Sequence, residues 1–345
     1  MSVETTDLAP GYPISRVIRG GWQLAGGHGA VKRDRAIADM RAFLDSGVTT
    51  FDCADIYTGV EELIGEFRAS LPPSDRLRLR VHTKFVPDLS ALATLRFADV
   101  ERIIDRSLLR LHADTLDLVQ FHWWDYGTPG LVDAAGHLAE LRRRGKIRHI
   151  GGTNFDAPHS RAMLDASVPL VSMQAQYSLL DRRVAGPLSA VCAESGMRFL
   201  CYGTVAGGFL SDRWLGQAAP AEPLANRSLV KYRLIIEEFG GWDAFQGLLR
   251  LLDGIGRRHG ASISAVATRW VLDQPYVAAA IIGARYAEHL ADNLTVFRFA
   301  LDPSDHAAIN ALLAEHPGPS GDFYALERDR TGPHGRIMKY ELNRD

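Results

Sequence analysis

Four polar residues occur at or just beyond the ends of short apolar runs, where packing alone does not explain them. Asp52 ends the run "VTTFD", Lys84 ends "VHTK", His122 ends "LVQFH", and Tyr57 follows Asp52 in the next loop. A strand that is buried on both faces should be almost continuous hydrocarbon. Polar side chains at such positions are therefore candidates for chemistry.

The four residue types together suit proton transfer to or from an oxygen atom. A buried lysine and aspartate favour pairing because an unpaired interior charge is costly. The ammonium group of Lys84 would stabilise a phenolate, which lowers the pKa of Tyr57 from the usual value of about 10. His122 could hydrogen-bond the substrate oxygen that Tyr57 protonates. Such a site would reduce a carbonyl or oxidise an alcohol, and since none of these groups supplies hydride, a nicotinamide cofactor is implied.

Each of the four residues, taken singly, also has an ordinary structural explanation. A strand aspartate is often a cap or an ion-pair partner, and a strand histidine is often a hydrogen-bonded core residue. Lys84 could extend its charged end to solvent, and Tyr57 could anchor its loop. The functional interpretation therefore depends on whether the fold brings the four together.

Short apolar runs alternate with helical stretches along most of the chain, which predicts an α/β fold of repeated βα units. Amphipathic helices are expected over residues 33–47, 98–112 and 131–145. Eight units favour a (β/α)8 TIM barrel, in which the carboxyl ends of the strands meet at one mouth. A doubly wound sheet is the alternative, but the chain lacks GxGxxG. The expected strands begin and end within residues 16–24, 48–55, 79–85, 116–123, 147–154, 170–177, 198–205 and 277–284.

The composition is that of a chain with a large core and small-molecule partners. Of its 345 residues, 46% are hydrophobic and 23% are charged, with a formal net charge of −2. No basic stripe favours nucleic acid, and no segment approaches the roughly 20 apolar residues that span a membrane. The three scattered cysteines indicate neither disulfides nor a structural zinc site. We expect a cytoplasmic protein without a bound metal, and the oligomeric state stays open.

We expect one domain over residues 1–345 with two irregular segments. Residues 206–240 form a long connection after the seventh strand, and such connections are usually functional or disordered. Residues 317–345 form a charged tail with interspersed Gly and Pro. The tail could fold over the barrel mouth, contact another subunit or be loosely ordered.

Several motifs resemble those of the aldo-keto reductase superfamily over about residues 15–315. They are "GVTTFDCADIYTGVEELIG", which has one residue more than usual before the glutamate, "VHTKF", "LVQFHWWD" and "GKIRHIGGTNF". The resemblance implies that Tyr57 is the general acid/base and that Lys84 and Asp52 tune it. It also implies that His122 orients the substrate oxygen.

The resemblance further implies a nicotinamide cofactor lying extended across the barrel mouth. Thr153, Asn154 and Gln174 would bind the carboxamide, and Tyr202 would stack on the nicotinamide ring. The remaining residues implied to bind cofactor are Gly21, Gly203, Thr204, Val205, Gly207, Leu210, Arg213, Gly283, Arg285, His289, Asp292 and Asn293. Gly203 and Thr204 replace a frequent serine-proline pair.

Arg285 favours NADP(H), because its guanidinium could pair with the 2′-phosphate. His289, however, replaces the family's usual arginine or glutamine, so NAD(H) remains possible. By the same resemblance, Trp22, Trp123 and Trp124 line a substrate pocket for a flat or apolar carbonyl compound or a ring.

Three other functions are alternatives to the reductase. They are an NAD-dependent sugar or alcohol dehydrogenase of the same fold, a nucleotide-sensing regulatory subunit, and a barrel metallohydrolase. The last finds no support, because the strands carry no HxH and the chain no HExxH.

Overall fold

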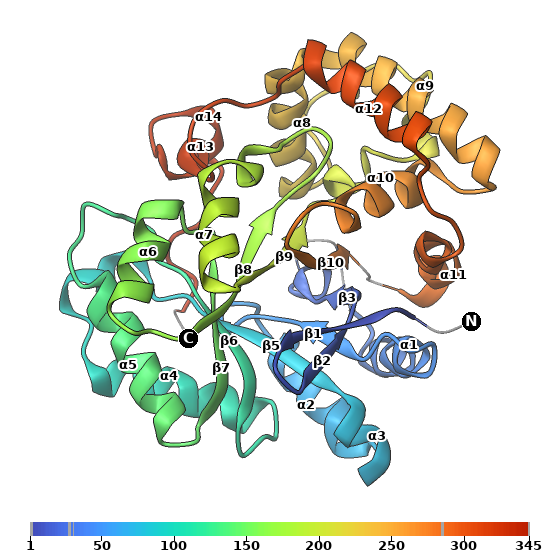
Figure 1. Ribbon diagram of the computed structural model, residues 1–345. Coiled ribbons are helices and arrows are strands. Elements are labelled where there is room, and N and C mark those ends of the chain that lie inside the picture. Colours follow the sequence, from blue (N-terminus) through green and yellow to red (C-terminus); the bar gives the residue numbers. More distant parts are fainter. Residues whose placement is uncertain (1–2, 27–28, 30, 284–285, 344–345) are drawn as a thin grey trace.

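A closed barrel of parallel strands forms the centre of the computed structural model, which describes residues 3–26, 29, 31–283 and 286–343 (Figure 1). The strands pair in chain order, and the last one pairs with the first to close the barrel. The predicted (β/α)8 architecture is confirmed, and each expected run supplies one strand. These strands are β3 (Val17–Gly20), β4 (Thr50–Asp52), β5 (Arg80–Phe85), β6 (Leu116–Phe121), β7 (Ile147–Thr153), β8 (Leu170–Gln176), β9 (Arg198–Tyr202) and β10 (Val277–Gly283).

Helices surround the barrel and bury their apolar stripes against the outer face of the strands (Figure 1). In α4, Val100, Ile103 and Ile104 are buried at helical spacing. The three expected helices appear as α1, α4 and α5. The helices are α1 (Arg33–Asp45), α2 (Val60–Ser70), α3 (Pro73–Arg78), α4 (Phe97–Arg110), α5 (Leu131–Arg143), α6 (Ala157–Asp165), α7 (Pro187–Ser195), α8 (Arg227–Phe239), α9 (Gly241–His259), α10 (Ile263–Leu272), α11 (Leu290–Asn293), α12 (Pro303–Glu315), α13 (Ala325–Arg328) and α14 (Pro333–Arg336). In the ranges given above, every helix is too short or too polar to cross a lipid bilayer.

Successive side chains of each strand point alternately into the barrel and out toward the helices. In β6, Leu118 packs inside the barrel, whereas Val119 and Phe121 belong to the core beneath the helices. The same alternation continues just past β6, so His122 faces inward and Trp123 faces outward.

An N-terminal hairpin packs against the interior core of the barrel. No pattern in the sequence predicted it. It consists of β1 (Thr5–Ala9) and β2 (Tyr12–Ser15), paired antiparallel. The ring of Tyr12 lies 4.5 Å from that of His149 and 6.1 Å from that of His82, centroid to centroid. Since both histidines lie on barrel strands, the hairpin covers the end of the barrel where those strands begin.

The long connection after β9 is partly helical. Its second half forms α8, which begins where the side chain of Asn226 accepts a hydrogen bond from the backbone N–H of Leu229 at 3.0 Å. Ile235, Ile236 and Phe239 bury one face of this helix. The capping asparagine and this spacing explain a helix that was not expected there.

The C-terminal tail crosses the mouth of the barrel. Near its start, Glu327 on α13 pairs with the buried Arg183 at 3.2 Å. Near its end, the Asn343 side chain donates to the carbonyl of Val86 at 2.6 Å. Between these contacts α14 packs beside α8 (Figure 1), where His334 lies 3.4 Å from Glu238. The described part of the tail is therefore held on both sides of the mouth.

Candidate active site

A buried ion pair lies at the carboxyl ends of β4 and β5. The ammonium nitrogen of Lys84 donates to Oδ1 of Asp52 at 2.6 Å and to the carbonyl oxygen of Cys53 at 2.8 Å. Burial by itself would lower the pKa of Lys84, but the charge of Asp52, reinforced by its hydrogen bond, raises that pKa above the ordinary lysine value. The lysine therefore stays charged at neutral pH.

The second oxygen of Asp52 is held by two side-chain amides. Gln120 donates to Oδ2 at 2.9 Å, and Gln174 donates to the same oxygen at 2.6 Å. Gln174 also donates to Oε1 of Gln120 at 2.9 Å. Both amides point their nitrogens at Asp52 because an ionised carboxylate only accepts. Gln120 was missed in the sequence, although a glutamine inside the apolar run "LVQF" is itself a signal of a buried polar contact.

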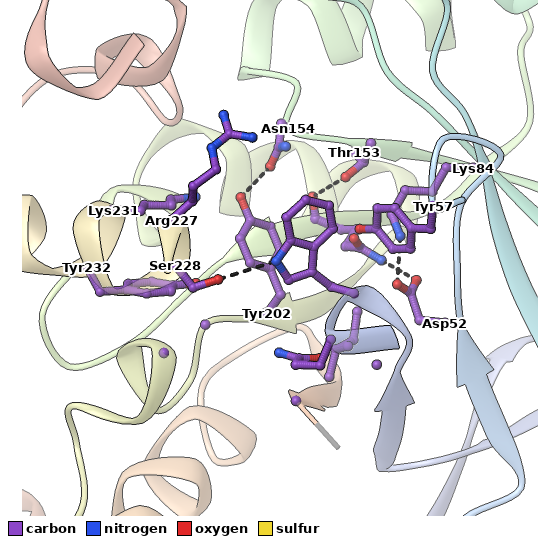
Figure 2. Close-up of a pocket in the computed structure, with 18 of the residues that line it drawn as sticks. Asp52, Tyr57, Lys84, Thr153, Asn154, Tyr202, Arg227, Ser228, Lys231 and Tyr232 are labelled. Atoms are coloured by element: carbon purple, nitrogen blue, oxygen red, sulfur yellow. Dashed lines mark hydrogen bonds and ion pairs between the residues drawn. The ribbon is translucent and has the colours of Figure 1, made fainter. Parts of the chain in front are cut away.

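Tyr57 lies over this network in the loop after β4. The ammonium nitrogen of Lys84 is 4.9 Å from the centroid of the Tyr57 ring (Figure 2). The Trp22 ring meets the Tyr57 ring edge-on, with 5.1 Å between the centroids. Burial raises the pKa of Tyr57, while the charge of Lys84 and a hydrogen-bonding interaction with it oppose the increase. The lysine acts in the expected direction, but the net shift is upward. The expectation of a lowered tyrosine pKa is therefore wrong, and Tyr57 is a protonated phenol at neutral pH.

His122 faces the same cavity with one nitrogen free. Its Nδ1 lies 2.9 Å from the carbonyl oxygen of Thr153, whereas Nε2 is buried without a partner among the residues that the structure describes. Burial, aided by the positive charge of Arg328, lowers the pKa of His122 to about 3. Because a carbonyl oxygen can only accept, the proton of this neutral ring resides on Nδ1. Nε2 then offers a lone pair to a hydroxyl group.

These residues line a cavity of about 490 Å³ at the barrel mouth. The four catalytic candidates Asp52, Tyr57, Lys84 and His122 all face it, and Figure 2 shows the first three together. The same cavity is lined by other predicted binding residues, namely Trp22, Trp124, Thr153, Asn154, Gln174, Tyr202, Gly203, Thr204, Val205, Gly207 and Gly283. The fold thus joins residues that are far apart in the sequence into one site.

Other predicted binding residues lie outside the cavity. The Trp123 side chain is fully buried beneath the helices, where its indole N–H donates to the carbonyl of Asp125 at 3.0 Å, so it is not in reach of a bound substrate. Gly21 lies behind the cavity wall, since its N–H donates to the carbonyl of Asp52 at 2.7 Å. Leu210 is in the core, Arg213 and His289 are exposed, and Asp292 and Asn293 lie on α11. Arg285 falls outside the described residues.

Several cavity residues were not predicted because they come from the late connection and the tail. Ser228 on α8 accepts a hydrogen bond from the Trp22 indole at 3.3 Å, which joins two sides of the mouth (Figure 2). Lys231 on α8 and Tyr324 just before α13 also line the cavity. No strand pattern pointed to them, since their position depends on how these segments pack over the barrel.

The cavity wall suits a nicotinamide dinucleotide. Gly203 and Gly207 have φ of 71° and 64°, in the left-handed region, and a Cβ on Gly203 would lie 2.3 Å from the Tyr232 hydroxyl. Both glycines line the cavity without a side chain of their own, so a phosphate could approach the backbone closely there. The volume is within the range of ligand sites, roughly 300–1,000 Å³. The Tyr202 ring also faces the cavity, with its hydroxyl donating to Asn154 Oδ1 at 2.9 Å.

Comparison with known proteins agrees with this geometry. The family model described as "Aldo/keto reductase family" matches residues 16–314. The chain belongs to the aldo/keto reductase family. It is accordingly an NAD(P)-dependent oxidoreductase acting on carbonyl or alcohol groups.

Individual relatives align with this chain over most of their length. Aldo-keto reductase YhdN of Bacillus subtilis is 29% identical, with 90% of this chain and 94% of that protein covered. The NADH-specific methylglyoxal reductase of Escherichia coli is 26% identical over 87% of this chain and 94% of that protein. Among solved structures, glycerol dehydrogenase AKR11B4 from Gluconobacter oxydans is 25% identical with a TM-score of 0.78, covering 93% of this chain and 97% of that one.

Proposed function

We propose that this aldo/keto reductase transfers hydride between NADPH and an aldehyde or ketone, with Tyr57 as the general acid/base. The observation that carries the proposal is the Asp52–Lys84 pair beneath the Tyr57 ring, with His122 lining the same cavity and its buried Nε2 without a partner among the described residues. A bound nicotinamide would supply the hydride. Thr153, Asn154, Tyr202 and the loop that begins at Gly203 would hold the cofactor.

In the proposed mechanism, Tyr57 donates its proton to the oxygen of the reduced substrate. Lys84, charged and fixed by Asp52, stabilises the phenolate that results. His122 is neutral with its proton on Nδ1, so its Nε2 accepts a hydrogen bond from the newly formed hydroxyl. This division of roles leaves Tyr57 as the proton source and His122 as the residue that orients the alcohol.

The test of this assignment is Tyr57→Phe, which removes the hydroxyl and keeps the ring. We expect kcat for carbonyl reduction to fall by about 10²–10⁴-fold. The dissociation constant of NADPH, measured by quenching of tryptophan fluorescence, should change little. A variant that retains most of its kcat would exclude Tyr57 as the proton donor.

An NAD-dependent alcohol or sugar dehydrogenase of the same fold is the second candidate. It is favoured by the exposed His289, which replaces a residue type suited to the 2′-phosphate, and by the E. coli relative, whose name specifies NADH. Titration with NADPH and NADH separates the two. At least tenfold tighter NADPH binding supports the first candidate, and equal or reversed affinities support the second. A regulatory subunit would bind nucleotide but show slow turnover with every substrate tried.

A further inference from the structure

Lys231 lines the cavity, and the proposed mechanism assigns no role to it. The residue lies on the first turns of α8 and makes no hydrogen bond or ion pair among the residues that the structure describes. The other lysine of the site is different, because Lys84 is fully engaged with Asp52 and Cys53. All the N–H donors of Lys231 are therefore available to a ligand.

Three tyrosine rings surround the ammonium group of Lys231. Its Nζ lies 5.0 Å from the centroid of the Tyr202 ring and 5.7 Å from those of Tyr232 and Tyr324. Such rings attract a cation through their faces but offer no strong acceptor for its N–H groups. Figure 2 shows Lys231 beside Arg227, on the side of the cavity where Asn154 and Tyr202 lie.

The ring contacts locate Lys231 near the reacting end of the cavity. Tyr324 lies 6.1 Å from the His122 ring, centroid to centroid, and Tyr202 is the residue proposed to stack on the nicotinamide. The glycine loop that suits the pyrophosphate packs against Tyr232, whose ring centroid lies 5.7 Å from Lys231 Nζ, whereas that of Tyr202 lies 5.0 Å away. Lys231 is thus between the glycine loop and the reacting end of the cavity, and its contacts with Tyr202 and Tyr324 favour the substrate side.

The nearest carboxylates do not satisfy Lys231. Asp181 and Glu327 act on it through their charges, but both bind Arg183, at 2.7 and 3.2 Å. Burial lowers the pKa of Lys231, and these two carboxylates partly offset that effect. A charged amine in this position gains most from an anionic oxygen delivered by a ligand.

Resting on the reductase function proposed above, we propose that Lys231 binds a carboxylate or phosphate group of the substrate. The substrate class is then a carbonyl compound with an anionic group at its far end, separated from the carbonyl by an aromatic ring or a short chain. The aromatic wall made by Tyr324 and Trp124 would pack on that spacer. Lys231 would determine specificity and would take no part in the proton transfer.

The test compares substrates that differ only in charge. The holoenzyme is assayed with 4-carboxybenzaldehyde, its neutral ester methyl 4-formylbenzoate, and 4-formylphenyl phosphate. We expect kcat/KM for one of the anionic aldehydes to exceed that for the ester by about ten- to hundredfold, as one charge-assisted hydrogen bond allows. The anion with the larger preference identifies the group, carboxylate or phosphate.

Two substitutions then assign the preference to Lys231. Lys231→Met should reduce the preference for the anion to less than about threefold, mainly through KM, while Lys231→Arg should retain part of it. Arg233→Met is the matched control, since it removes a positive charge from the same helix at a residue paired with Glu237. The control should keep the preference of the wild type.

The possible failures are distinguishable. If the wild type reduces the ester and both anions equally well, the Lys231 proposal is wrong and the reductase function stands. If Lys231→Met weakens NADPH binding and leaves the anion preference intact, Lys231 binds the cofactor, and the proposal is likewise overturned. If no aldehyde is reduced with either cofactor while both cofactors bind, the proposed function itself fails.

Discussion

The side-chain nitrogen of Gln174 lies 2.6 Å from Oδ2 of Asp52, while Lys84 binds the other oxygen of the same carboxylate. Asp52 is thereby held from two sides, with Gln120 as a third donor. The nitrogen of Gln174 is committed to this network, so its oxygen is the atom that remains for the N–H group of a ligand. Gln174, which was predicted to contact the cofactor, therefore also holds the carboxylate that binds Lys84.

Gln120→Met tests this support at a residue outside the cavity lining. The substitution keeps the length of the side chain but removes the donor to Asp52 and the acceptor of Gln174. We expect a loss of about 1–3 kcal/mol in the free energy of unfolding, measured by urea denaturation, together with a lower kcat. Unchanged stability would mean that Gln120 contributes nothing to the position of Asp52.

Lys84→Met should remove the charge that stabilises the phenolate of Tyr57. We expect kcat for alcohol oxidation, in which the phenolate of Tyr57 accepts the proton, to fall by about 10²-fold or more at pH 7. The fall should be smaller at higher pH, where the phenol loses its proton more easily. A kcat profile over pH for the wild type and the variant checks both points. An undiminished rate at pH 7 would remove Lys84 from the mechanism.

Acid should destabilise the fold through two buried histidines. Burial lowers the pKa of His82, and likewise that of His122, to about 3 in the folded protein, against about 6.5 in an unfolded chain. Between these values the unfolded chain binds more protons, so the stabilising effect is complete above pH 6.5 and is lost as the pH falls toward 3. Each histidine contributes about 1.4 kcal/mol per pH unit in this window.

His82→Phe should therefore flatten the dependence of stability on pH between 6.5 and 4. Urea denaturation at several pH values measures the slope for the wild type and the variant. His289→Met, at an exposed position, is the control for loss of a histidine. Equal slopes for wild type and His82→Phe would contradict the assignment of a neutral, buried His82.

Arg328→Ala should loosen the tail over the cavity. Arg328 donates to the carbonyl oxygens of Trp124 at 2.9 Å and of Asn154 at 2.8 Å, and it stacks on Tyr126 at 3.7 Å from the ring centroid. We expect faster chymotryptic cleavage within residues 317–345, at sites such as Tyr324 and Tyr340 that the substitution leaves in place, and a higher KM for the carbonyl substrate. Arg336→Ala, at an exposed position of α14, should leave both unchanged. Equal cleavage rates for wild type and Arg328→Ala would show that other contacts hold the tail.

The barrel and the catalytic candidates were predictable because both depend on local patterns. Apolar runs define the strands, and Asp52, Lys84 and His122 interrupt those runs at matching positions. The same period of two could have excluded Trp123, since the neighbour of an inward His122 must face outward. Trp123 was instead selected by resemblance, which carries no information on direction.

The rest of the site depends on contacts between distant segments. Lys231 and Ser228 reach the cavity only because α8 folds back over the mouth, and Tyr324 does so because Glu327 and Arg328 fix the tail. Nothing within a few residues of these side chains indicates such packing. The upward shift of the Tyr57 pKa was missed for a similar reason, since burial by the surrounding chain outweighs the nearby charge of Lys84.

The hairpin β1–β2 covers the end of the barrel that lies opposite the mouth, and it packs on the side chains that fill the interior. With Tyr12 packed against His82 and His149 at that end, the described chain leaves the mouth as the way in and the way out. A product must then retrace the path of its substrate, beneath the tail that spans the mouth. Motion of the tail would limit turnover whenever the chemical step is fast.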